Sequence, residues 1–147
     1  MNKLNQVEIL LVEDNPVDAE LIIRALKEQK LANEMYVVEN GVEALDFLYC
    51  RGEFDQRTDN SALKVVFLDV KLPKLNGLEV LQKMKSDPEI KKIPVVMVTS
   101  SCENQDIRKA YELGANSYVV KPVGFEHFIS AMKNSGLFWL QINQASV

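Results

Sequence analysis

The feature that most constrains the fold is a short apolar run, Val-Val-Phe-Leu at 65–68, that ends on a carboxylate, Asp69. A continuous apolar run of this length is typical of a strand that is buried on both faces, as in a parallel sheet. Pro73 and the pair Asn76-Gly77 follow, and they mark a loop. Asp69 would then lie at the edge where open α/β sheets bind ligands. Taken alone, the residue is explained equally well by the preference of aspartate for turns.

Four more apolar runs share this pattern, and each of the five is followed by helical periodicity. We expect strands at 7–12, 35–38, 65–68, 93–98 and 117–120. We expect helices from an Asn15 N-cap to about residue 30, over 42–49, 77–86 and 103–113, and from about Phe125 onward. Because parallel strands need crossover connections, the alternation predicts an α/β fold, a doubly wound five-stranded parallel sheet with helices on both faces.

The remaining segments are interpreted from local composition. The pair Asn40-Gly41 is a turn signal, and the polar, aperiodic segment 53–61 predicts an exposed loop that is longer than such a connection needs. The 147 residues suit a single domain with a core over about 7–133 and an apolar helix or tail over 134–147.

Composition and charge narrow the classes of function. The formal net charge of −4 argues against non-specific nucleic-acid binding, which needs a basic face. No apolar run approaches about 18 residues, so no transmembrane helix is expected, and the run at 9–12 is too short for an export signal. Cys50 and Cys102 lie far apart without a metal-type spacing, and we expect them to be reduced thiols of a cytoplasmic protein.

Polar residues with complementary chemistry follow four of the five predicted strands. Glu13 and Asp14 follow the first strand, Asp69 the third, and Lys121 the fifth, while Thr99 comes at the end of the fourth. In a parallel sheet these ends lie at the same edge, so we expect three carboxylates, a hydroxyl and an ammonium to converge there. Turn chemistry alone would need a coincidence at all four strand ends.

The converging carboxylates need positive charge beside them. At about 4 Å two such groups repel by roughly 4 kcal/mol at an effective dielectric constant of about 20. Lys121 supplies one positive charge, and oxygen ligands without His or Cys favour Mg²⁺ as the second and argue against zinc. A carboxylate beside such a cation, a hydroxyl and a lysine is suited to phosphoryl transfer, with the carboxylate as nucleophile. No G-x-x-x-x-G-K-[ST] loop is present, so ATP is not the expected direct donor.

The chain resembles the receiver domains of response regulators at four stretches, which occur in the family's order. The stretches are Leu11-Val12-Glu13-Asp14-Asn15, Leu68-Asp69-Val70-Lys71-Leu72-Pro73 with Asn76-Gly77, Val98-Thr99-Ser100, and Tyr118-Val119-Val120-Lys121-Pro122. The resemblance covers residues 7–132 and implies a flavodoxin-like fold with strand order 2-1-3-4-5. It also implies a two-component signalling domain, which catalyses only its own phosphorylation and dephosphorylation and is not an enzyme in the usual sense.

The resemblance implies a role for each matching position. Asp69 is the expected phosphoacceptor, which receives a phosphoryl group from the phosphohistidine of a sensor histidine kinase. The expected ligands of Mg²⁺ (or Mn²⁺) are Asp14 and Asp69 directly, Glu13 through water, and the backbone carbonyl of Lys71. The other implied roles are phosphoryl binding by Thr99 and Lys121, a switch formed by Thr99 and Tyr118, and a cis peptide bond at Pro122. Tyr118 and Lys71 also have plain structural explanations, as a half-buried strand tyrosine and a solvated loop lysine.

Several features resemble a subgroup, the stand-alone regulators that are paired with bacterial phytochromes. These features are the loop at 53–61, the Leu72-Pro73-Lys74 loop, the turn at 86–91 and the aromatic tail at 137–140. No DNA-reading helix or effector enzyme fits after Val120, so we expect output through a protein surface that includes Tyr111, Tyr118, Phe125 and Phe128. The expected partners are a phytochrome-type sensor kinase and a downstream target or phosphotransfer protein, without nucleic acid or membrane. We expect the apolar segment 137–140 to pack either in a homodimer or back on its own domain.

Three other functions share parts of this pattern. A phosphorelay shuttle, which passes its phosphoryl group to a histidine phosphotransfer protein, would use the same residues. A phosphatase with an Asp nucleophile commonly carries a D-x-D pattern after the first strand, and that pattern is absent here. A flavodoxin-like electron carrier needs a loop that accepts a phosphate at this position, where Glu13 and Asp14 would repel the phosphate of FMN.

Overall fold

The centre of the molecule is a sheet of five parallel strands in the order β2-β1-β3-β4-β5, which confirms the predicted fold class and strand order. The structure is a computed structural model, and it describes residues 3–28 and 34–121. The strands are β1 (Ile9–Val12), β2 (Met35–Val38), β3 (Val65–Leu68), β4 (Val95–Thr99) and β5 (Ser117–Val120). Val12 pairs with Leu68, so the next residues, Glu13 and Asp69, leave the sheet from neighbouring strands at the same level.

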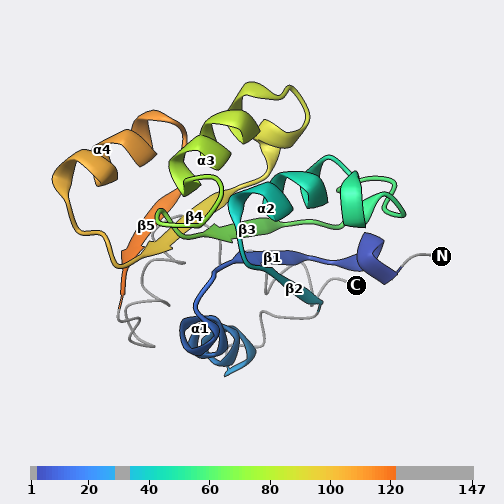
Figure 1. Ribbon diagram of the computed structural model, residues 1–147, viewed down its shortest axis with the longest axis horizontal. Helices are drawn as coiled ribbons and strands as arrows, with labels where there is room; N and C mark the ends of the chain where they lie inside the picture. The colour runs from blue at the N-terminus through green and yellow to red at the C-terminus, as the bar shows by residue number, and fades with distance from the viewer. Residues whose placement is uncertain (1–2, 29–33, 122–147) are drawn as a thin grey trace.

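Within the described residues, four α-helices lie on the two faces of this sheet: α1 (Pro16–Glu28), α2 (Gly41–Leu48), α3 (Gly77–Ser86) and α4 (Asn104–Glu112). In Figure 1, α2, α3 and α4 cover one face and α1 lies on the other. Three short 3-10 helices occur outside the sheet: η1 (Lys3–Gln6), η2 (Gly52–Phe54) and η3 (Ile90–Lys92). None of the helices in the described ranges is long and apolar enough to cross a membrane. The helix expected near Phe125 and the tail at 134–147 lie outside these ranges.

The strands alternate their side chains between two apolar layers, which explains why their sequences are continuously hydrophobic. The layer beneath α2 and α3 includes Leu10, Val12, Val66 and Leu68. The layer beneath α1 includes Ile9, Leu11, Val65 and Phe67. All eight of these side chains are at most 1% exposed. A slip of one residue in pairing would exchange the two layers, so burial fixes the register and with it the positions of the residues at the strand ends.

Asparagine side chains begin three of the helices in the described part of the chain. Asn15 Oδ1 accepts hydrogen bonds from the backbone N–H groups two and three residues later, at 2.9 and 3.2 Å, which confirms the predicted cap of α1. Asn40 lies in the bend between β2 and α2, as the turn signal indicates, and it caps α2, which begins at Gly41, one residue earlier than predicted. Asn76 caps α3 in the same way.

The segment 53–61 is mostly exposed, as its composition predicts, but two of its side chains are buried. Phe54 and Arg57 within it are 3% and 2% exposed. Phe54 packs edge-to-face on Phe47 with 5.2 Å between ring centroids, and the Arg57 guanidinium carbon lies 3.7 Å from the centre of the Phe47 ring. Arg57 also donates hydrogen bonds to the backbone carbonyls of Leu4, Phe47 and Asp59. An arginine that is buried against a ring and carbonyl groups leaves no periodic pattern, so the composition alone is misleading here.

Two strands begin two residues later than predicted. β1 begins at Ile9, because the Val7 N–H bonds to the carbonyl of Leu4 and closes the turn after η1. β4 begins at Val95, because Ile93 ends η3 by donating its N–H to the carbonyl of Ile90.

Candidate functional site

The carboxyl ends of β1, β3, β4 and β5 lie at one edge of the sheet (Figure 1). Glu13, Asp14 and Asp69 meet there, and each offers a carboxylate oxygen within 4.8 Å of the other two; we call these residues the acid cluster. Glu13 and Asp69 are 2% and 5% exposed, whereas Asp14 is exposed. The cluster is therefore enclosed by protein on one side and open to solvent at Asp14.

Lys121 supplies the positive charge of the site. Its Nζ donates hydrogen bonds to Glu13 Oε1 at 2.5 Å, to Asp69 Oδ2 at 2.8 Å and to Asp18 Oδ2 at 3.0 Å. Its backbone N–H bonds to the carbonyl of Thr99, which fixes the residue at the end of β5. The predicted convergence of strand-end side chains is confirmed for the acids and for this lysine.

Backbone amides orient the two buried carboxylates. Glu13 Oε2 accepts from the N–H of Asn15 at 3.1 Å, and Asp69 Oδ1 accepts from the N–H of Lys71 at 3.2 Å. In each buried carboxylate, one oxygen thus accepts a hydrogen bond from the Lys121 ammonium and the other accepts one from a backbone N–H in the loop after the strand. Both groups are held in one orientation before any ligand arrives.

The electrostatics of the site reflect burial and an excess of acids. Burial raises the pKa of Glu13 to about 7, Asp69 adds to the rise, and the hydrogen bonds from Lys121 and Asn15 offset only part of it. Burial lowers the pKa of Lys121, but its hydrogen bonds to Asp69, Glu13 and Asp18 outweigh this effect, so the pKa lies above its usual range. The lysine is therefore a permanent cation that is outnumbered by carboxylates.

The acid cluster fits a divalent cation by its donor chemistry. It presents three oxygen ligands on short side chains, and one side is open for water or for a further oxygen ligand. Mg²⁺ and Mn²⁺ bind such sets with several waters retained. Glu13, Asp14 and Asp69 would hold the ion, and its charge would offset the excess of carboxylates that Lys121 leaves unbalanced.

Thr99 and Tyr118 meet at the loop that follows β4. Thr99 is fully buried, and its Oγ1 accepts a hydrogen bond from the Ser101 N–H at 3.2 Å. The half-buried Tyr118 donates from its hydroxyl to the Ser101 carbonyl at 2.9 Å, and burial raises the pKa of this phenol. The Ser101 hydroxyl in turn donates to Asp106 in the first turn of α4. A network of hydrogen bonds therefore connects the predicted switch pair through Ser101.

Two predicted site residues contribute less to the described site. The Lys71 side chain is exposed, and its backbone N–H contacts Asp69; the role of its carbonyl as a ligand stays a prediction. Pro122, with its predicted cis peptide bond, lies outside the described residues, as do Phe125 and Phe128 of the predicted output surface.

Asp18 is a site residue that the sequence reasoning missed. It lies in the first turn of α1 and not at a strand end, so the pattern of residues at the carboxyl ends of the strands does not include it. A usable signal was its spacing: Asp18 follows the acidic pair at 13–14 within one turn of a capped helix that starts at the same edge.

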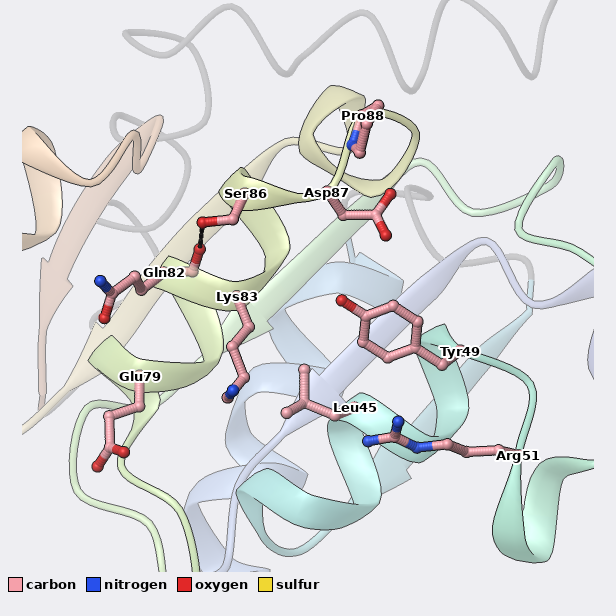
Figure 2. Close-up of a pocket in the computed structure, with 9 residues that line it drawn as sticks. All are labelled: Leu45, Tyr49, Arg51, Glu79, Gln82, Lys83, Ser86, Asp87 and Pro88. Atoms are coloured by element: carbon pink, nitrogen blue, oxygen red, sulfur yellow. Dashed lines mark hydrogen bonds between the residues drawn. The ribbon is translucent and has the colours of Figure 1, made fainter.

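A groove of about 650 Å³ between α2 and α3 lies apart from the acid cluster (Figure 2). It is lined by Leu45, Tyr49, Arg51, Glu79, Gln82, Lys83, Ser86, Asp87 and Pro88. In Figure 2 the ends of the Lys83 and Arg51 side chains lie on either side of Leu45. The lining includes the last turns of both helices, and none of the residues that converge on Lys121 belongs to it. The groove is therefore not part of the candidate site.

Comparisons with known proteins agree with this geometry. A profile of the response regulator receiver domain matches residues 9–133. The response regulator Rcp1 of Synechocystis sp. is 34% identical over 133 residues, which cover 90% of this chain and 88% of Rcp1. A solved structure of its Mn(2+)-bound form has a TM-score of 0.75 at 34% identity and covers 91% of this chain and 94% of that one.

Two further solved structures are similar. The bacteriophytochrome response regulator RtBRR is 51% identical with a TM-score of 0.81, and the match covers 90% of this chain and 80% of that chain. The phosphorylated cyanobacterial phytochrome response regulator RcpA is 36% identical with a TM-score of 0.76 and covers 92% of this chain and 94% of that one. Strand order, acid cluster and sequence similarity over most of the length lead to the same conclusion: the chain belongs to the response regulator receiver domain family.

Proposed function

We propose that the chain is a stand-alone response regulator in which Asp69 accepts a phosphoryl group from the phosphohistidine of a sensor histidine kinase. One observation carries the proposal. The Asp69 carboxylate is 5% exposed, lies 2.8 Å from the Lys121 ammonium and shares a cluster with two further acids. It is thus a fixed nucleophile with a cation on one side and oxygen ligands for a second cation on the other.

The reaction balances as a simple phosphoryl transfer. An Asp69 carboxylate oxygen forms a bond to phosphorus while the bond from phosphorus to the kinase histidine nitrogen breaks. The electron pair of the broken bond stays on the imidazole, which takes up a proton. The product is an acyl phosphate on Asp69 and a neutral histidine on the kinase.

Charge is the main obstacle to this transfer, because an anionic phosphoryl group must approach a group of acids. Lys121 offers its ammonium to the phosphoryl oxygens from its place beside Asp69. A divalent cation, which we propose to be Mg²⁺, supplies further positive charge when it is held by Asp14 and Asp69 directly, by Glu13 through water and by the Lys71 carbonyl. The proposal of Mg²⁺ is supported by the donor atoms of the acid cluster, which are all carboxylate oxygens.

The proposed response begins at Thr99. Its hydroxyl now accepts from the Ser101 N–H, and a phosphoryl group on Asp69 offers it a stronger, charged acceptor. When the Thr99 hydroxyl turns toward that group, it loses its hydrogen bond from the Ser101 N–H. The carbonyl of the same Ser101 accepts a hydrogen bond from the Tyr118 hydroxyl. The change is thereby passed to α4 and β5, where Tyr111 is 49% exposed on the proposed output surface.

The proposed partner is a sensor kinase of the phytochrome type, on the strength of the similarity to RtBRR and RcpA. The proposed output is binding of a downstream protein or of a second copy of the chain. The apolar segment 137–140, which would contribute to a dimer, lies outside the described residues.

Intact-mass spectrometry after incubation with acetyl phosphate and Mg²⁺ tests the proposal. The mass should rise by one phosphoryl group, and the increase should disappear in Asp69→Asn and in the presence of a chelator. Glu20→Gln is a matched control, since it removes an exposed acid from α1 without touching the site. Absence of any mass increase in the folded wild type would refute the phosphoacceptor role. Steady turnover of p-nitrophenyl phosphate would favour a phosphatase instead.

A further inference from the structure

The Lys121 ammonium has three carboxylate partners, and they come from two kinds of structure. Glu13 and Asp69 are attached to strand ends, whereas Asp18 belongs to the first turn of α1. The distance from Lys121 Nζ to Asp18 Oδ2 is 3.0 Å, comparable to the bond to Asp69. The lysine side chain is only 11% exposed, so its position is set by these contacts.

Asp18 differs from the other two partners in its relation to a metal ion. Among the described residues, the acids placed to share a cation are Glu13, Asp14 and Asp69, and Asp18 is not one of them. A cation in the acid cluster would draw electron density from Glu13 and Asp69 and so weaken their hold on Lys121. The bond between Asp18 and Lys121 is the one that this competition leaves intact.

The fold holds Asp18 in a position where it can keep its bond to Lys121. Its backbone N–H donates to Asn15 Oδ1 at 3.2 Å in the cap of α1, so the first turn of the helix is ordered at the edge of the sheet. Its side chain is 33% exposed, which leaves the carboxylate in contact with solvent on one side and with the buried ammonium on the other.

We propose that Asp18 is a positioning residue, which keeps the Lys121 ammonium beside Asp69 while a divalent cation engages the acid cluster. The inference rests on the proposed function, because it assigns Asp18 a part in the same phosphoryl transfer. Asp18 itself touches neither the cation nor the phosphoryl group; it acts through Lys121.

Two effects of Asp18 on the transfer oppose each other. Its hydrogen bond holds Lys121 in place, whereas its negative charge repels an anionic donor. Solvent screens the repulsion, because the side chain is one-third exposed. A charge-assisted hydrogen bond to a largely buried ammonium is weakened less by solvent, so positioning is the larger effect.

The first experiment measures the rate of phosphorylation by acetyl phosphate at saturating Mg²⁺. Asp18→Ala should slow the reaction about tenfold or more, the loss expected for one hydrogen bond to a charged group. Asp18→Asn keeps an oxygen acceptor and removes the charge, so it should recover part of the rate. Glu20→Ala, an exposed acid on the same helix, should leave the rate unchanged. Equal acceleration by both Asp18 variants would show that repulsion dominates and would overturn the proposal.

A double-mutant cycle distinguishes positioning from a general structural effect. If Asp18 acts through Lys121, then Asp18→Ala should have no further effect on the rate in a Lys121→Ala background. A slowing of the same size in that background would refute the proposal. The Mg²⁺ dissociation constant of Asp18→Ala should stay within about threefold of the wild type, since Asp18 is not among the acids placed to share the ion.

A second readout does not depend on phosphorylation at all. This readout is the NMR signal of the Lys121 ammonium in protein with isotope-labelled lysine, and the signal is assigned by its loss in Lys121→Ala. In the wild type with saturating Mg²⁺ this NMR signal should persist. In Asp18→Ala with Mg²⁺ the signal should broaden or disappear, because the freed ammonium exchanges with water. Persistence of the signal in that variant overturns the positioning role, whereas failure of the wild type to be phosphorylated would overturn the proposed function alone.

Discussion

The pH dependence of folding should report directly on Glu13. This carboxyl is 2% exposed, and its pKa is raised from an ordinary 4.5 to about 7, mainly by burial. Between these values the folded protein holds a proton that the unfolded chain has released, so the free energy of unfolding falls as the pH rises. Each tenfold change in an acid constant is worth about 1.4 kcal/mol. Glu13 therefore contributes about 3 kcal/mol that is fully present below pH 4.5 and is lost as the pH passes about 7.

Urea unfolding in the presence of a chelator measures this contribution. Glu13→Gln keeps the length of the side chain and an oxygen that accepts from Lys121, but it cannot ionise. The wild type should therefore lose about 3 kcal/mol relative to Glu13→Gln between about pH 4.5 and 7.5, while other titrating groups cancel in the difference. Glu20→Gln should follow the wild-type curve, because its side chain is 64% exposed.

The outcome in Mg²⁺ is a second part of the same prediction. A cation favours the ionised carboxyl, so saturating Mg²⁺ should restore most of the stability that the wild type loses at higher pH and should restore less in Glu13→Gln. Parallel stability curves for the wild type and Glu13→Gln without metal would refute the reasoning, since they would mean that Glu13 ionises in the folded protein as easily as it does in the unfolded chain.

Three further substitutions test how the fold supports the site, each by urea unfolding. Gly77→Ala should destabilise by about 2–3 kcal/mol despite the helix preference of alanine, because the added Cβ would overlap the backbone carbonyl of Asp69; an unchanged or higher stability would contradict this. Arg57→Lys should cost about 2 kcal/mol, since a lysine cannot reproduce the guanidinium stacking on Phe47 and its bonds to several carbonyls. Asn40→Ala should cost about 1 kcal/mol through loss of the α2 cap. Asn40→Asp should restore only part of this stability, because an aspartate accepts from the Glu43 N–H but cannot donate to the Glu43 carboxylate as the amide does.

The sheet could be predicted from the sequence because burial on both faces leaves a signal that few other structures produce. The runs at 65–68 and 9–12 are almost uniformly buried, so each residue in them had to be apolar. The segment 53–61 shows the opposite case. Arg57 is buried by stacking on a ring and by bonding to carbonyls, and neither partner has a fixed spacing along the chain. A polar composition then predicts the exposure of most of the segment but misses the one arginine that the fold buries.

The site was predictable to the extent that it follows from strand ends. Register alone places Glu13 beside Asp69. The order of strands places Lys121 two strands from Asp69 and three from Glu13, and its long side chain reaches both. Asp18 was missed because it lies on a helix and not at a strand end, so only its spacing from the acidic pair at 13–14 could have indicated it. The hydrogen bonds of Ser101 were missed for a similar reason, since they depend on the path of one loop.

One side of the site is held by the sheet, and the other is held by side chains. The backbone N–H groups of Glu13, Asp69 and Lys121 each bond to a carbonyl of the neighbouring strand, so these residues extend the ladder of the sheet by one position. Thr99 and Tyr118 also belong to strands, but their side chains are held by hydrogen bonds to a single loop residue, Ser101. Moving the backbones of the first group would break ladder bonds in a buried setting, at about 1 kcal/mol or more for each. The Thr99 hydroxyl can instead exchange its bond to Ser101 for a charge-assisted bond to a phosphoryl group on Asp69. A new charge on Asp69 should therefore leave the acids and Lys121 in place, and the conformational response should start in the loop between β4 and α4.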